Sequence, residues 1–72
     1  MPQRVAGRIP VLEALRAGRR KPRRLYLLRE AKGLEALREA SRGVPIEEVS
    51  RDRLDALSEG VVHQGVVLDA ES

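Results

Sequence analysis

Short apolar runs alternate along this chain with segments of helical spacing, and this alternation constrains the fold more than any other feature. Leu25 to Leu28 form a continuous apolar run that is typical of a strand buried on both faces. Leu34 and Leu37, by contrast, lie three residues apart, as they would on one side of a helix. The pattern predicts strands at residues 4–6, 25–28, 44–49 and 66–68, and helices at residues 10–17, 31–42 and 51–58.

Proline, glycine and serine mark the ends of the expected helices. Pro10 suits a first helical turn, where a missing N–H is no loss, and Gly18 suits a left-handed helix end. Gly43 and Gly60 are expected to end the second and third helices. Ser50 is the expected N-cap of the third helix, because its hydroxyl can accept a free backbone N–H.

Strict alternation of strand and helix predicts a three-layer α/β/α sandwich, with helices on both faces of a sheet. We expect a mainly parallel or mixed four-stranded sheet. A chain of 72 residues forms one domain, and its stability margin is thin because so short a chain buries only about 60% of its unfolded surface. We place the domain at residues 1–68 and expect residues 69–72 to form a polar tail or the start of a linker.

The residue types that are missing exclude several kinds of site. The chain has no cysteine, which excludes disulfides and thiolate metal sites, and its single histidine, His63, cannot assemble a histidine-rich metal site. No apolar run is long enough to span a bilayer, and no secretory-type apolar stretch follows the N-terminus. We therefore expect a cytoplasmic protein without a metal.

Positive charge is concentrated in the first part of the chain. Residues 1–29 contain nine Lys or Arg and one acid, whereas residues 30–72 contain five bases and ten acids. Six of the nine bases fall between Arg16 and Arg24. We call residues 19–24, where Pro22 stops the helix from continuing, the basic connector. Arginine matches phosphate oxygens, so this segment predicts a polyanion partner, with a solvated loop as the alternative.

Two other features bear on nucleic-acid recognition. Tyr26 is the only aromatic residue and lies in an apolar strand, so we expect it in the core and expect recognition of folded RNA through backbone and shape. His63 and Gln64 precede Gly65 at the mouth of the last strand. They can bond RNA or satisfy the loop's own backbone, and the residues alone favour the structural role. Gly65 is expected to supply a backbone angle that other residues resist.

The chain offers little for catalysis. Its serines lie outside any nucleophile-elbow context. Glu47 and Glu48 are neighbours on an expected strand, so their side chains point to opposite faces and cannot act as a carboxylate pair. We expect no catalytic residue in this chain.

The segment at residues 6–15 (AGRIPVLEAL) resembles the opening G-x-x-x-V-x-E-A-L pattern of the SpoU/TrmH-family RNA ribose methyltransferases. The match is carried by Gly7, Val11, Glu13, Ala14 and Leu15. Three later stretches fit as well and extend the resemblance over essentially the whole chain: Val49-Ser50, Leu54-Asp55 with Leu57, and His63-Gln64-Gly65-Val66.

The resemblance implies the N-terminal substrate-binding domain of this family, with a fold similar to ribosomal and kink-turn-binding proteins. It implies a cytoplasmic enzyme that methylates a ribose 2′-hydroxyl in ribosomal or transfer RNA, most similar to the bacterial large-subunit rRNA guanosine 2′-O-methyltransferases. The S-adenosylmethionine site, the catalytic residues and the dimer-forming domain would follow these residues. We therefore expect no cofactor in this chain, a monomeric isolated domain and a homodimeric full enzyme.

Charge and resemblance together give the expected site. Gly7 and Gly65 match the family's glycines and are expected to be structural. The RNA-binding candidates are Arg8, Arg16, Arg19, Arg20, Lys21, Arg23, Arg24, His63 and Gln64. Two alternatives remain open. One is a free-standing ribosome-associated RNA-binding protein of similar fold. The other is a protein-interaction module that uses the acids Glu30, Glu35, Glu39, Glu47 and Glu48.

Overall fold

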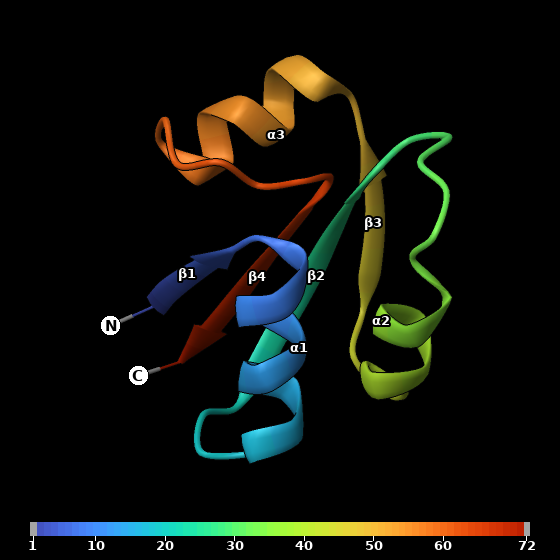
Figure 1. The fold of residues 1–72 in the computed structure, drawn as a ribbon. Coiled ribbons are helices and arrows are strands. Elements are labelled where there is room, and N and C mark those ends of the chain that lie inside the picture. Colours follow the sequence, from blue (N-terminus) through green and yellow to red (C-terminus); the bar gives the residue numbers. More distant parts are fainter. Residues whose placement is uncertain (1, 72) are drawn as a thin grey trace.

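The computed structural model describes residues 2–71 and folds them into four strands and three helices (Figure 1). In chain order these are β1 (Pro2–Ala6), α1 (Arg8–Ala17), β2 (Pro22–Leu28), α2 (Glu35–Ala40), β3 (Ile46–Val49), α3 (Arg51–Ser58) and β4 (Val66–Glu71). The strict alternation of strand and helix that the sequence predicted is confirmed.

The four strands form a mixed sheet in the order β1-β4-β2-β3. β2 and β3 are parallel, whereas β4 runs antiparallel to both of its neighbours, β1 and β2. Of the two sheets expected, the mixed one is confirmed and the mainly parallel one is wrong. Alternating elements do not reveal that the last strand inserts between the first two and reverses direction there.

Helices cover both faces of the sheet and make the expected three layers. Figure 1 shows α1 and α2 on one side and α3 on the other. Leu25 and Leu27 of β2 pack into the larger core beneath α1 and α2, while Tyr26 and Leu28 pack against the smaller core beneath α3. The continuous apolar run of β2 therefore supplies side chains to the cores on both faces of the sheet. Tyr26 packs against the smaller core, in line with its expected place in the core.

Capping explains which helix boundaries could be predicted. α3 begins and ends at the expected residues because the Ser50 hydroxyl accepts the Arg53 backbone N–H at 3.2 Å. α1 ends as expected before Gly18, whose φ of 63° is left-handed. It begins at Arg8, so Pro10 lies within its first turn. Gly60 was expected to end α3; the C-cap is instead Glu59, with a left-handed φ of 53°, and Gly60 follows it with a φ of 85°.

Two segments differ from the prediction. α2 covers only Glu35–Ala40, not residues 31–42, because Gly33 has a φ of 77° and the preceding residues form a loop. β4 continues to Glu71, so residues 69–71 are not a polar tail. Ala70 is buried in the larger core, and Asp69 Oδ1 is buried without a hydrogen-bond partner among residues 2–71. Ser72 lies outside the described residues.

Candidate functional site

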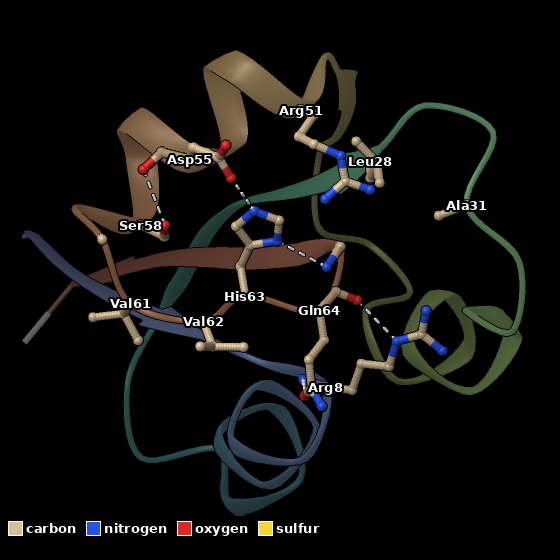
Figure 2. A pocket seen from close by; sticks show the side chains of 12 residues that line it. Arg8, Leu28, Ala31, Arg51, Asp55, Ser58, Val61, Val62, His63 and Gln64 are labelled. Carbon is tan, nitrogen blue, oxygen red and sulfur yellow. Dashed lines mark hydrogen bonds and ion pairs between the residues drawn. The ribbon is translucent and has the colours of Figure 1, made fainter.

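A cleft of about 900 Å³ opens at the end of the sheet where β2 ends and β4 begins (Figure 2). Its walls come from α3, from the start of α1 and from two loops. We call residues 59–65, which join α3 to β4, the rim loop; the other loop follows β2. Figure 2 shows Arg51 of α3, Val62 of the rim loop and Arg8 of α1 around the opening. The cleft therefore gathers residues that are far apart in the sequence.

His63 belongs to the rim loop and is buried, with only 7% of its surface exposed. The Gly65 backbone N–H donates to His63 Nδ1 at 2.9 Å, so the proton of the neutral ring lies on Nε2. Nε2 in turn donates to Asp55 Oδ1 at 2.6 Å. His63 thereby links the rim loop to α3, and neither ring nitrogen is left for a ligand.

Arg8 and Gln64 join the start of α1 to the rim loop. Gln64 Oε1 accepts the Arg8 backbone N–H at 3.0 Å, which satisfies one of the free donors of the first helical turn. The Arg8 side chain donates from Nε to the Gln64 carbonyl at 2.9 Å, and its terminal nitrogens donate to the carbonyls of Lys32 and Gly33. Arg8 thus holds three segments together, and the Gln64 amide nitrogen stays uncommitted within residues 2–71.

The two expected structural glycines lie beside these contacts. Gly7 has a φ of 103°, and a Cβ there would lie 3.3 Å from Pro10 Cδ and 3.5 Å from Gln64 Oε1. Gly65 has a φ of 89° and presents its N–H to His63. Positive φ values of this kind strain any residue that has a Cβ, so both positions require glycine.

The basic connector lies at the opposite end of the sheet. Pro22 is paired with Ala70 near the end of β4, whereas Leu27 is paired with Val66 at its start. Arg24 forms an ion pair with Glu47 at 3.0 Å. The other candidate cations of this region are exposed and form no ion pair within residues 2–71: Arg16, Arg19, Arg20, Lys21 and Arg23.

The expected site residues therefore form two groups. Arg8, His63 and Gln64 meet at the cleft, and the cations around the basic connector meet at the far end. The seven residues of β2 separate the groups by about 20 Å. RNA contact by any of these residues stays a prediction. The hydrogen bonds of His63 and Arg8 give both residues a structural role.

Neither a metal site nor a membrane span occurs in the part of the chain that the structure describes. Among residues 2–71, no group of His, Asp and Glu is arranged to hold a metal ion. None of the helices in that range has the length and apolar character needed to cross a membrane.

Comparison with known families identifies the domain. A family model described as RNA 2′-O ribose methyltransferase substrate binding matches residues 4–72. The chain belongs to this family. A search among curated proteins found no match. The resemblance noted in residues 6–15 and 49–66 is thereby confirmed, and the chain is the substrate-binding domain of a SpoU-type RNA ribose 2′-O-methyltransferase.

In this SpoU-type domain, the residues of the cleft that sequence reasoning missed include Arg51, Val61 and Val62. Arg51 lines it and forms no ion pair within residues 2–71. Val61 and Val62 also line it and are 59% and 77% exposed. Two adjacent valines directly after an expected helix end are unusual for a solvated loop, and this signal could have pointed to them. Arg51 gave no signal, because a cation on a short helix is ordinary.

Proposed function

We propose that this substrate-binding domain holds structured RNA by its phosphates through the basic connector. The observation that carries this proposal is the set of exposed cations from Arg16 to Arg23 at one end of the sheet, which form no ion pair with any described residue. Each phosphate contact releases condensed counterions, so a cluster of free cations contributes affinity that depends strongly on salt. Ion-paired cations contribute less, because a neighbouring carboxylate already neutralises them.

We propose further that methyl transfer depends on S-adenosylmethionine held outside residues 2–71. The cleft does not suit this cofactor, which carries a sulfonium and an ammonium cation. Arg8 and Arg51 line the cleft, and Asp55, the one carboxylate among its described lining residues, already accepts a hydrogen bond from His63. We therefore expect no RNA methylation when the chain is supplied with RNA and the cofactor alone.

The wider setting follows from the resemblance. We propose ribosomal RNA as the substrate, the cytoplasm as the location, a monomeric isolated domain and a homodimeric full enzyme. The family match favours the RNA-recognition domain over a free-standing RNA-binding protein. The protein-interaction alternative loses support from the ion pairs, because three of its five acids are bonded to arginines of this same domain: Glu39, Glu47 and Glu48.

A charge-matched pair of variants tests the connector. We expect Arg19→Ala/Arg20→Ala to weaken binding of a labelled hairpin from large-subunit rRNA by about tenfold. The slope of log affinity against log salt concentration should become shallower by about 0.7 to 0.9 for each phosphate that the protein no longer neutralises. Fluorescence anisotropy at several salt concentrations measures both. Arg38→Ala/Arg42→Ala removes the same charge from cations already paired with Glu48 and Glu39, and it should change affinity little.

The outcome separates a specific surface from general charge. Equal weakening by both double variants would show that only net charge matters. Absence of binding by the unsubstituted chain at low salt would contradict the proposed function itself.

A further inference from the structure

We propose that the cleft receives one unpaired nucleotide of the bound RNA, with its base against Val61 and Val62 and its phosphate on Arg51. This inference rests on the proposed RNA-binding function and extends it. It assigns a second contact region, separate from the basic connector, and it names the structural element of the RNA that this region takes.

The first support is the charge of the cleft. Two arginines line it, Arg8 and Arg51. Asp55, the one carboxylate that lines it among residues 2–71, is already bonded to His63. The guanidinium of Arg8 is bonded to three backbone carbonyls, whereas Arg51 has no ion pair within residues 2–71. The cleft is therefore positive, and Arg51 is the cation free to meet a phosphate.

The second support is the apolar surface beside this cation. Val61 and Val62 are exposed, and the half-buried Leu28 and Ala31 add further apolar wall to the cleft. Such a surface gains little from a paired base, whose faces are already stacked. An unpaired base offers an apolar face that aliphatic side chains can cover, as they do for flipped-out bases.

The third support is that the cleft is built before any ligand arrives. The bonds from His63 to Asp55 and Gly65 hold the rim loop on α3. The bond from Arg8 to the Gln64 carbonyl holds the same loop on α1. A loop fixed at both sides keeps Val62 and Arg51 on opposite walls of the cleft (Figure 2). Preorganisation of this kind lowers the entropy lost on binding. The free Gln64 amide group supplies donors for the edge of the base.

A pair of RNA hairpins tests the proposal. The two are identical except that one carries a single bulged nucleotide in an otherwise fully paired stem. We expect the 72-residue chain to bind the bulged hairpin about fivefold more tightly, at the low end of base stacking because the wall is aliphatic. Backbone amides of the rim loop should shift in NMR spectra with the bulged hairpin alone, and amides of the basic connector with both.

Two substitutions and two controls locate the effect. Arg51→Gln and Val62→Ser should each remove the preference for the bulged hairpin while the fully paired hairpin binds as before. Arg53→Gln changes a cation of the same helix that is already paired with Glu47, and Ile9→Ser changes an exposed apolar residue that does not line the cleft. Both controls should keep the preference.

The possible results separate this inference from the proposed function. Equal binding of both hairpins, with shifts confined to the basic connector, would overturn the nucleotide site and leave the proposed function intact. Failure of both hairpins to bind at low salt would overturn both. Loss of the preference in all four variants would show that it does not arise in the cleft.

Discussion

The cleft end and the connector end of this domain are built in opposite ways. At the cleft, every sequence-predicted site residue is bonded into the structure: His63 to α3, Gln64 to α1, and Arg8 to two loops. At the connector, most of the cations are exposed and without an ion pair in residues 2–71. The bonded residues His63, Gln64 and Arg8 at the first end should thus matter for folding, and loss of the exposed cations at the second end should affect RNA binding but not stability.

Among the variants that test this contrast, His63→Ala should lower the stability of the domain most. It leaves the buried Gly65 N–H without an acceptor and removes a ring that fills space beneath the rim loop. We expect the free energy of unfolding to fall by about 2–4 kcal/mol. Urea denaturation measures the loss.

Asp55→Asn is the matched control, because it keeps an acceptor for His63 Nε2 on a side chain that is 59% exposed. It should cost well under half as much. If His63→Ala unfolded no more easily than this control, the bond to Gly65 would not be what holds the rim loop.

Gln64→Ala should have a smaller effect, of about 1 kcal/mol, because it removes the acceptor for the first free N–H of α1. In a domain of this size that corresponds to a fall in Tm of about 4–8 °C. Gln64→Glu keeps an acceptor at the same place and adds an anion near the helix start, so it should lose little or no stability. Equal losses in the two variants would assign the effect to the left-handed backbone of residue 64 instead.

The connector should show the smallest effect on stability. We expect Arg19→Ala/Arg20→Ala to change the free energy of unfolding by less than about 0.5 kcal/mol, as exposed and unpaired residues usually do. Thermal unfolding of the same preparations used for RNA binding measures this. A marked loss of stability would mean that the connector is also part of the scaffold, and the contrast between the two ends would no longer hold.

The same contrast shows what the sequence could predict. Local signals predicted local structure: Ser50 defined the start of α3, and Gly18 defined the end of α1. The charge of the basic connector was visible because its residues are consecutive. The position of β4 was not visible, since strand insertion depends on contacts between residues that are far apart in the sequence.

The cleft could be predicted from the sequence only in part, because it too depends on contacts between residues that are far apart in the chain. Gln64 could be identified as a polar residue at the mouth of a strand, but its role as acceptor of the Arg8 N–H requires the fold that places it beside the start of α1. α2 was expected to begin at residue 31, yet the carbonyls of Lys32 and Gly33 are needed to accept hydrogen bonds from Arg8. These hydrogen bonds join residues more than twenty positions apart, so the sequence around residues 31–34 carries no local sign of them.

The place of β4 in the sheet also determines when the domain can fold. Within residues 2–71, β1 is the first strand of the domain to be synthesised, and its only sheet neighbour is β4, the last. β2 must likewise wait for β4 along one of its edges. During synthesis the earlier segments can form a β2–α2–β3 unit and little more of the sheet. The sheet can be completed only after almost the last described residue has been synthesised. Strand pairings between residues so distant in sequence make folding slow.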